Sequence, residues 1–431
     1  MTPAPRPHGP HEPHGPHEPH RLDPRGIDPH PVNEELRAQG AAVPLVLPGD
    51  VAGFAVTRHQ ELKEFLGHPD VAKNACHFAA LQRGEIPEGW PLTTFATVRG
   101  MTTADGPDHR RLRSLVSRAF TARRIEALRP RVTELTGELL DDLESAAAAN
   151  GGVADLRRHF AFPLPMSVVC ELLGIGRELT HRLHVLSNRI VSTDIRAEHV
   201  LSANRELLAV LAQVVDEHRL SPGGDDLTAA LLAAQEEDGD RLSGEELIGT
   251  LLLLIVAGHE TTLNLVTNAV RALCAHRDQL ELVRAGKADW ADVVEETLRY
   301  DSPVSYFPFR YPTRDLTVDG TVIPAGTPVL AAYSAAGRDP RAHGPEADRF
   351  DVTRPPSRHL SFGHGPHYCI GAPLARLEAS TALRQLFTRF PQLELAQDEA
   401  SLPRHKSFVG NSVHQLPVRL GPAASVASSA R

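Results

Sequence analysis

The amino-acid sequence predicts an α+β fold that is largely α-helical. Apolar residues recur with helical spacing over most of the chain, whereas strand-like patterns are confined to two short patches. Strands and helices do not alternate in the way that builds a parallel sheet, so a helix-rich domain with a small β-rich region is expected. The helical patterns cover residues 107–120, 124–149, 198–219, 243–276, 290–300 and 372–390.

The two strand-like patches each contain turn signals. In the first, residues 43–59, short apolar runs are broken by proline and glycine, which predicts a small hairpin. The second, residues 316–332, has turn signals at Asp319-Gly320 and Pro324-Ala325-Gly326. Both patches therefore belong to the minor β region.

The chain begins with a low-complexity segment rich in histidine and proline, residues 1–21. Such a composition cannot bury a core, so the segment is expected to be disordered, followed by a single domain over residues 22–431. Its histidines recur every third residue and would share one face of a polyproline II helix, which could bind a divalent metal weakly. A solvated tail without a metal is the favoured interpretation. These histidines are His8, His11, His14, His17 and His20.

Bulk composition excludes several classes of protein. The formal net charge of −9 argues against general nucleic-acid binding. We find no run of about 20 apolar residues and no signal-peptide layout, so a cytoplasmic protein without a membrane span is expected. The four cysteines are far apart and form no disulfide or zinc pattern; they are Cys76, Cys170, Cys274 and Cys369.

Cys369 differs from the other cysteines in its surroundings. It lies in the segment FGHGPHYCIGAPLAR (362–376), where glycines allow close approach of the backbone to a flat group. A helical pattern begins at Ala372, so the positive end of a helix is expected to lower the thiol pKa and to stabilise a thiolate. The alternative is a tight loop that contains an ordinary buried cysteine.

This loop resembles the haem-binding loop of the cytochrome P-450 family, in the pattern Phe-x-x-Gly-x-x-x-Cys-x-Gly. The resemblance implies the cytochrome P-450 fold, with haem b between the long central helix and the cysteine loop. Cys369 would be the iron ligand, and a thiolate ligand favours O–O cleavage. Further haem contacts implied in the loop are Phe362, Gly363, His367 and Gly371.

The long helix expected from about residue 243 begins with a capping box, Ser243 and Glu246. Its apolar middle is interrupted by AGHETT (257–262), which resembles the oxygen-binding groove of the same family. By that resemblance Thr261 would hydrogen-bond dioxygen and Glu260 would relay protons, as general acid catalysis requires. Ala257 and Gly258 would leave room for O2. An exposed polar turn is the alternative.

Other matches concern the haem propionates and the core. His109 and Arg113 are four residues apart on one helical face, where the family places two propionate ligands. Arg310 and His367 match further propionate contacts. A basic surface helix is the alternative for residues 108–121. Glu296 and Arg299 are similar to a structural pair of the family that a third arginine completes, for which Arg349 is the candidate.

The resulting prediction is a haem-thiolate monooxygenase. Because no GxGxxG fingerprint for a nicotinamide or flavin is found, electrons are expected from a ferredoxin and its reductase. The alternatives are a peroxide-driven peroxygenase and a haem protein that binds a ligand without turnover. Substrates are expected to be hydrophobic, and macrolide-, steroid- or natural-product-like by resemblance. Apolar residues expected around the substrate include Phe95, Ile255, Val304, Phe307 and Phe408.

An electron donor needs a place to dock, and one stretch of the acidic chain is strongly basic. Arginines on the helix that the family places near the cysteine side of haem would attract an acidic ferredoxin. Internal pairing with nearby acids is the alternative. These arginines are Arg110, Arg111, Arg113, Arg118, Arg123 and Arg124.

Overall fold

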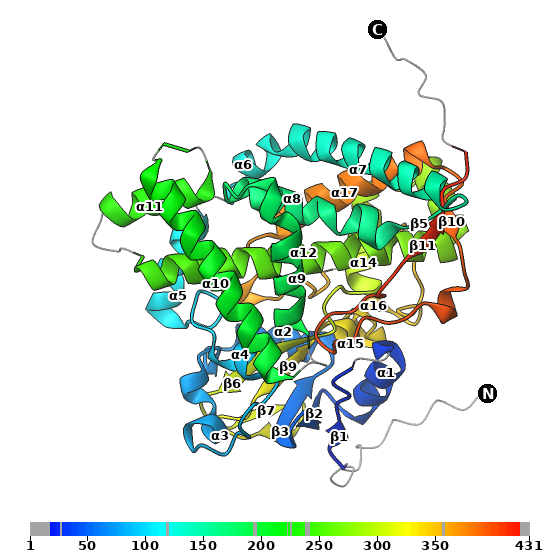
Figure 1. Cartoon of the computed structure of the whole chain (residues 1–431). Helices are drawn as coiled ribbons and strands as arrows, with labels where there is room; N and C mark the ends of the chain where they lie inside the picture. Colours follow the sequence, from blue (N-terminus) through cyan, green and yellow to red (C-terminus); the bar gives the residue numbers. More distant parts are fainter. Residues whose placement is uncertain are drawn as a thin grey trace, which may run out of the picture.

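A helix of 32 residues, α12 (Gly244–Ala275), runs through the middle of the protein (Figure 1). The predicted capping box is confirmed: Ser243 Oγ accepts a hydrogen bond from the Glu246 amide, and a Glu246 carboxylate oxygen accepts one from the Ser243 amide. This computed structural model describes residues 18–25, 28–117, 120–192, 196–221, 223–224, 226–237, 242–355 and 358–422.

Other helices surround α12 and bury most of its second half. Those packed directly on it include α8 (Pro163–Leu172), α9 (Thr180–Val191), α10 (Ala197–Leu220), α14 (Trp290–Tyr300) and α17 (Ala372–Arg389). The remaining α-helices of the described residues are α1 (Pro29–Gln39), α2 (His59–Gly67), α3 (Ala79–Gln82), α4 (Thr93–Thr97), α5 (Gly106–Ser117), α6 (Ala122–Ala127), α7 (Arg129–Ala149), α11 (Leu227–Glu237), α13 (Arg277–Arg284), α15 (Tyr333–Gly337) and α16 (Pro340–His343).

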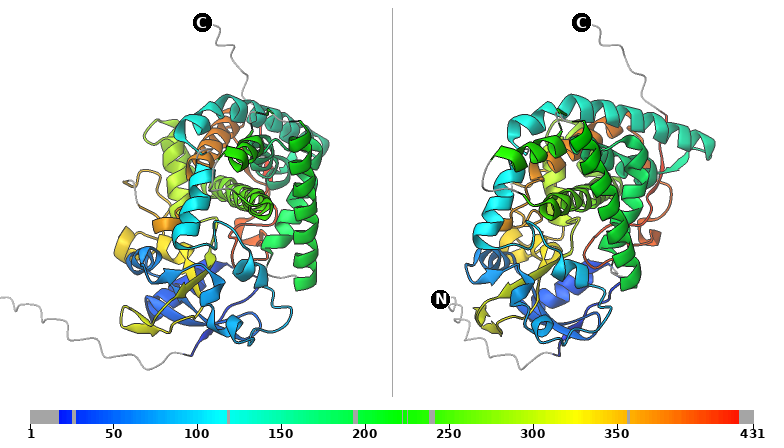
Figure 2. Two further views of the ribbon diagram at one scale, coloured as in Figure 1. Left: turned by 90° about the vertical axis from the view of Figure 1, so that its left-hand side faces the viewer. Right: turned by 60° about the vertical axis from the view of Figure 1, so that its left-hand side comes forward.

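The strands of the main sheet gather at one end of the molecule, below the helices (Figure 2). The main sheet has the order β1-β2-β3-β9-β6-β4. Its strands are β1 (His20–Arg21), β2 (Ala42–Leu47), β3 (Val51–Val56), β4 (Val71–Ala72), β6 (Tyr306–Pro312) and β9 (Val329–Ala332). Two smaller sheets pair β10 (Glu394–Leu395), β11 (Pro417–Arg419) and β5 (Val153–Asp155), and β7 (Leu316–Val318) with β8 (Thr321–Ile323).

Both predicted β patches are confirmed. Strands β2 and β3 form an antiparallel hairpin in which Ala42 pairs with Val56. The turn between them has positive φ angles at Gly49 (77°) and Asp50 (59°), which explains the glycine at its tip. In the second patch β7 and β8 form a hairpin, and β9 joins the main sheet beside β3. The expected mostly helical α+β fold is therefore correct.

The observed elements differ from the predicted ones at two places. The helix expected over 124–149 is divided, because Pro130 lacks an amide hydrogen and starts a new helix, α7, after α6. Near the N-terminus, His20–Arg21 pairs in parallel with Leu45 and Val46, so ordered structure begins before the expected boundary at residue 22. Residues 1–17, which carry the rest of the predicted tail, lie outside the described residues.

Helix α12 is also the one helix of the described residues that is long and apolar enough, by length and composition, to cross a membrane. Its most apolar window has a mean hydropathy of 1.4. Because the sequence has no apolar run of about 20 residues, a helix of this hydropathy was not predicted. However, 56% of that window is buried inside the protein, as expected for the central helix of a helical core.

Candidate active site

The cysteine loop is held close to helix α2 by its glycines. Gly363 and Gly365 have φ angles of 75° and 71°, which L side chains rarely adopt. A Cβ atom on Gly365 would also lie 2.9 Å from the carbonyl oxygen of Leu66. The amide of Cys369 donates a hydrogen bond to the carbonyl oxygen of Phe362 at 2.8 Å, which closes the loop. The glycines of this loop therefore allow the close approach of the backbone that the sequence predicted.

Cys369 lies three residues before the first residue of α17, with its side chain open to a cavity. The expected lowering of its thiol pKa is wrong. Burial by surrounding protein raises the pKa of the Cys369 thiol, and the amides of Gly371 and Ala372 and the charge of Arg113 only partly oppose it. A thiolate at this position therefore needs a bound cation, because metal coordination deprotonates a thiol.

The cavity separates this loop from helix α12 and has a volume of about 220 Å³. Thr261 faces it and donates a hydrogen bond to the carbonyl oxygen of Ala257 at 2.8 Å. Both Ala257 and Gly258 are exposed toward the cavity. The predicted site residues that line it are His109, Arg113, Ala257, Gly258, Thr261, Arg310, Phe362, His367, Cys369 and Gly371.

Two predicted site residues do not line the cavity. Gly363 is a buried residue of the cysteine loop that does not face the cavity, and a Cβ atom on it would lie 3.3 Å from the Tyr333 hydroxyl. Glu260 is 5% exposed and points away from the cavity, because successive residues of an α-helix project about 100° apart. Thr261 and Glu260 therefore lie on different faces of α12.

Glu260 is instead paired with Arg157, which comes from a π-helical turn, Arg157–Ala161. The Arg157 guanidinium donates to Glu260 Oε1 at 2.9 Å and to Asn264 Oδ1 at 2.8 Å. Burial alone would raise the pKa of Glu260, but Arg157 and three nearby histidines lower it below its ordinary value. The carboxylate is therefore ionised at neutral pH. The histidines are His184, His259 and His405.

One end of the cavity is basic. The His109 and His367 rings lie 4.1 Å apart between centroids, and burial lowers the pKa of His367 to about 4. Among the described residues, the hydrogen-bond partners of buried Arg310 are the Phe309 carbonyl (3.3 Å) and Tyr333. His109 Nε2 is buried and has no hydrogen-bond partner among the described residues. His367 Nε2 lies 3.9 Å from Asp105 Oδ1, whereas His109 and Arg310 have no anionic hydrogen-bond partner among the described residues, which fits a ligand that carries carboxylates.

Sequence reasoning missed two charged residues of the cavity wall. Lys73 is 4% exposed, and burial beside Arg310 holds its pKa well below the usual range. Its Nζ donates to the carbonyl oxygen of Pro308 at 3.2 Å. Glu378, on α17, is buried, which raises its pKa to about 8. Neither belongs to a recognisable local pattern, so only the folded chain reveals them. Glu378 is the sole acid among the described residues that line the cavity.

The rest of the wall is apolar, which suits a hydrophobic substrate. Of the apolar residues expected around the substrate, Val304 and Phe307 line the cavity. Phe95 and Ile255 pack in the hydrophobic core, and Phe408 lines a different cavity. Further apolar lining residues are Met101, Phe120, Val169, Leu172, Leu253, Leu254, Leu265, Leu298, Ile370 and Leu374.

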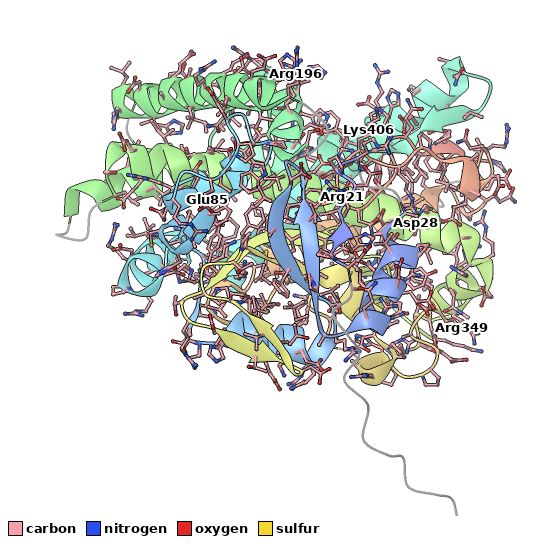
Figure 3. All side chains as sticks on the ribbon, turned by 90° about the horizontal axis from the view of Figure 1, so that it is seen from below. Arg21, Asp28, Glu85, Arg196, Arg349 and Lys406 are labelled. Atoms are coloured by element: carbon pink, nitrogen blue, oxygen red, sulfur yellow. The ribbon has the colours of Figure 1, made fainter. Side chains whose placement is uncertain are left out.

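Helix α14 carries a buried ion pair. Arg299 is fully buried and donates to both carboxylate oxygens of Glu296 at 2.7 and 2.8 Å, as predicted. The prediction that Arg349 is the third partner is wrong, because the Arg349 side chain lies at the margin of the molecule (Figure 3) beside Glu346. Arg354 takes that place, with its Nε 3.5 Å from Glu296.

The helical core, the cysteine loop and the cavity facing α12 define a haem-thiolate monooxygenase of the cytochrome P450 family. A family model described as cytochrome P450 matches residues 56–285 and 291–420, and the chain belongs to that family. Its enzymatic class is that of the P450 monooxygenases.

Similar proteins are known from actinobacteria. The chain is 40% identical to 2-hydroxy-5-methyl-1-naphthoate 7-hydroxylase of Streptomyces carzinostaticus, over 94% of this chain and 99% of the relative. It is 42% identical to 6-deoxyerythronolide B hydroxylase of Saccharopolyspora erythraea, over 91% and 96%. Among solved structures, CYP154C4 of Streptomyces sp. W2061 superimposes with a TM-score of 0.90 at 43% identity, over 94% of this chain and 99% of that one.

Proposed function

We propose that the protein binds haem b in the cavity between Cys369 and α12 and hydroxylates a hydrophobic substrate there. The observation that carries the proposal is that a cysteine, a basic cluster and the Thr261 groove line one cavity. Cys369 would ligate the iron, and His109, Arg113, Arg310, His367 and Lys73 would bind the propionates. When bound, a thiolate-ligated haem activates O2 for transfer of one oxygen atom.

The remaining site residues would transfer protons or shape the cavity. Thr261 holds a hydroxyl at the cavity wall, anchored to the carbonyl oxygen of Ala257, where it can hydrogen-bond dioxygen. Glu260, which lies on a different face of α12, would relay protons to Thr261. Ala257 and Gly258 present no bulky side chain, so the groove admits a small diatomic ligand. Phe362 and Gly371 form the walls nearest the thiol.

We assign the substrate to hydrophobic polycyclic or macrocyclic natural products. The apolar wall supports this class, and the two curated relatives are named for hydroxylation of a naphthoate and of 6-deoxyerythronolide B. We further assign electron supply to a ferredoxin and its reductase, and the protein to the cytoplasm. The chain from His20 onward would form the single catalytic domain.

The test is turnover of a panel of macrolactones, steroids and polycyclic aromatics by the haem-loaded protein with ferredoxin, reductase and NADPH. Substrates are first selected by the change that they cause in the haem absorption spectrum. Incorporation of one atom from 18O2 into a product supports the proposal. Absence of haem uptake, or haem binding without product from any spectrally active compound, contradicts it.

A further inference from the structure

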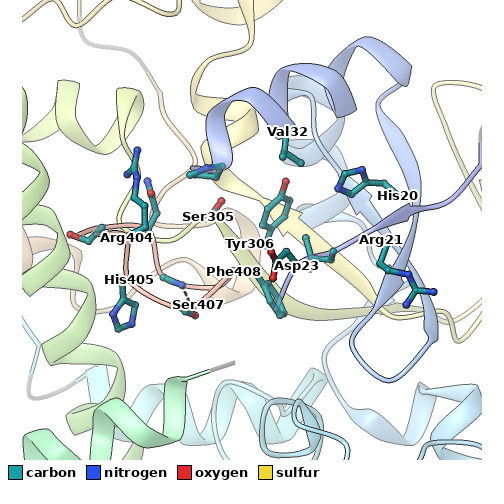
Figure 4. Close-up of a pocket in the computed structure, with 15 residues that line it drawn as sticks. His20, Arg21, Asp23, Val32, Ser305, Tyr306, Arg404, His405, Ser407 and Phe408 are labelled. Atoms are coloured by element: carbon teal, nitrogen blue, oxygen red, sulfur yellow. Dashed lines mark hydrogen bonds between the residues drawn. The ribbon is translucent and has the colours of Figure 1, made fainter. Parts of the chain in front are cut away.

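A second cavity lies between the N-terminal segment and a turn near the C-terminus (Figure 4). Its volume is about 150 Å³, room for several waters at about 30 Å³ each. Two buried polar atoms of its lining residues, Ser305 Oγ and Arg404 Nη1, have no hydrogen-bond partner among the residues described. Buried polar atoms are rarely left unsatisfied, so water is expected to occupy this cavity.

His405 connects this cavity with Glu260. The turn that carries it is fixed by the His405 amide, which donates to the Ser412 carbonyl oxygen at 3.0 Å. Its ring points away from Tyr306 and the N-terminal strand (Figure 4). At its tip, Nε2 lies 3.9 Å from Glu260 Oε1. That separation exceeds hydrogen-bond length, and a side-chain shift of about 1 Å would close it.

The protonation states of this pair suit a relay. Burial lowers the pKa of His405, although Glu260 opposes this effect, and so the ring is neutral at physiological pH. Arg157 keeps Glu260 ionised and ready to accept a proton. The other charged or titratable groups that act on His405 are Arg157 and His414. Glu260 Oε2 is buried without a hydrogen-bond partner in the described part of the chain, so this carboxylate can turn toward another group.

We propose that His405 carries protons from water in the second cavity to Glu260, and thus to Thr261. This inference rests on the proposed function. In each step a proton leaves His405 Nε2 for Glu260 Oε1, while Nδ1 takes a proton that bulk solvent supplies through cavity water, so the water is left unchanged. The ring stays neutral overall and returns to its first tautomer by a ring flip or by exchange with water. His405 acts through Glu260 and does not touch the reacting atoms.

A rival route through His184 and His259 is less suited to proton entry. Both nitrogens of His259 are buried without a partner among the described residues, and its side chain is fully buried. The His184 ring packs on Phe162 with centroids 3.7 Å apart, and burial lowers the pKa of His184 to about 4. Neither histidine lines the second cavity. Among the described residues, the second cavity reaches the neighbourhood of Glu260 through His405.

The experiment replaces His405 with glutamine in the haem-loaded enzyme, with ferredoxin and reductase supplying electrons. Gln keeps the size and polarity of the ring but cannot shuttle a proton. We expect product formed per NADPH to fall on the order of ten-fold, less than the 10²–10⁴ of an acid touching the reacting atoms. In the His405→Gln variant the solvent deuterium isotope effect on product formation should rise. The variant's product formed per NADPH should also increase as the pH falls. A purely structural role would move neither measurement.

Two further variants keep the test decisive. Ser305→Leu fills the water cavity without touching His405 and should reproduce the loss of coupling, even if His405→Gln folds poorly. His199→Gln, an exposed histidine on α10, is the matched control and should behave like the wild type. The inference is overturned if Ser305→Leu and His405→Gln leave coupling and isotope effect unchanged, or if His184→Gln alone changes them. Wild-type protein that forms no product would instead contradict the proposed function.

Discussion

The guanidinium of Arg113 donates a hydrogen bond to the carbonyl oxygen of Tyr368 at 2.7 Å and so ties helix α5 to the residue directly before Cys369. Arg113 also lines the haem cavity. The Arg113 side chain therefore positions the loop that carries the thiol. It also forms part of the cavity wall that the proposed haem propionates would face. Loss of this side chain should affect haem retention before it affects chemistry.

Arg113→Met should accelerate haem loss roughly ten- to hundred-fold, since a hydrogen bond to a charged group contributes about 1.5–3 kcal/mol. Transfer of haem to an excess of apomyoglobin measures the rate. Arg110→Met, on the exposed face of the same helix, serves as the control and should leave the rate unchanged. Equal rates for the two variants would show that Arg113 has no part in holding haem.

Cys369→Ser should abolish the red-shifted Soret band that reduced haem-thiolate proteins show under carbon monoxide. The reason is that a serine hydroxyl remains protonated and donates little electron density to iron. Of the other cysteines, Cys170 is buried and Cys274 packs near Leu393, and neither they nor Cys76 line the cavity that Cys369 faces. If the variant keeps the band, the ligand is another residue and the proposed site is wrong.

Thr261→Ala should retain haem and substrate binding while most of the reducing equivalents leave as hydrogen peroxide. The substitution removes the hydroxyl that Ala257 orients toward the cavity. Product and peroxide formed per NADPH measure the effect, and a fall in product of about 10²-fold is the scale of lost general acid catalysis. Thr267→Ala, one and a half turns further on and bonded to Leu263, controls for helix packing. Coupling that survives Thr261→Ala would assign Thr261 a structural role.

The same variants separate the monooxygenase from its alternatives. A peroxygenase would form product with peroxide alone at a rate that does not depend on Thr261. A haem protein without turnover would form no product under either condition. Measurement of the wild type with ferredoxin and then with peroxide alone therefore distinguishes the three hypotheses.

Arg354→Ala should lower the thermal midpoint of the haem-loaded protein, whereas Arg349→Ala should not. Arg354 lies beside the buried Glu296 carboxylate and donates to the carbonyl oxygens of His343 and Glu346. We expect a loss of about 1–3 kcal/mol for these hydrogen bonds. Arg349 pairs only with exposed Glu346 through its side chain, and exposed pairs contribute little. Equal midpoints for the two variants would reverse the assignment.

Short patterns explain what could be predicted from the sequence. The cysteine loop was predicted because its glycines are local constraints on the backbone around Cys369. The start of α12 was predicted because Ser243 and Glu246 are three residues apart. The raised pKa of the Cys369 thiol was not predicted, because burial by residues distant in sequence raises this pKa more than the amides at the start of α17 lower it.

The residues that were missed have no local signal. Lys73, Arg157 and His405 each contact a residue more than 100 positions away in the sequence, and only packing brings them there. Arg157 looks like a surface arginine in sequence, next to Arg158, yet it is 6% exposed and bonded to Glu260. Side chains that meet through tertiary contacts lie outside the reach of periodicity and motif spacing.

The basic patch predicted for ferredoxin docking is partly retained by the fold. Arg113 turns inward to Tyr368, and Arg111 pairs with Glu246 at 2.5 Å, so these two are committed within the protein. Arg118 lies outside the described residues. The three that are exposed and form no ion pair among the described residues are Arg110, Arg123 and Arg124, on α5 and α6.

These three arginines should steer an acidic ferredoxin toward the cysteine side despite the net charge of −9. Such attraction is screened over about 8–10 Å at ordinary ionic strength, so the rate of ferredoxin-supported reduction should fall as salt rises. Charge reversal at Arg110, Arg123 and Arg124 to Glu should slow reduction further at low salt and remove most of the salt dependence. Arg205→Glu, exposed on α10, is the control and should have little effect. Stopped-flow reduction under carbon monoxide gives the rates. Rates that ignore both salt and charge reversal would place the docking surface elsewhere.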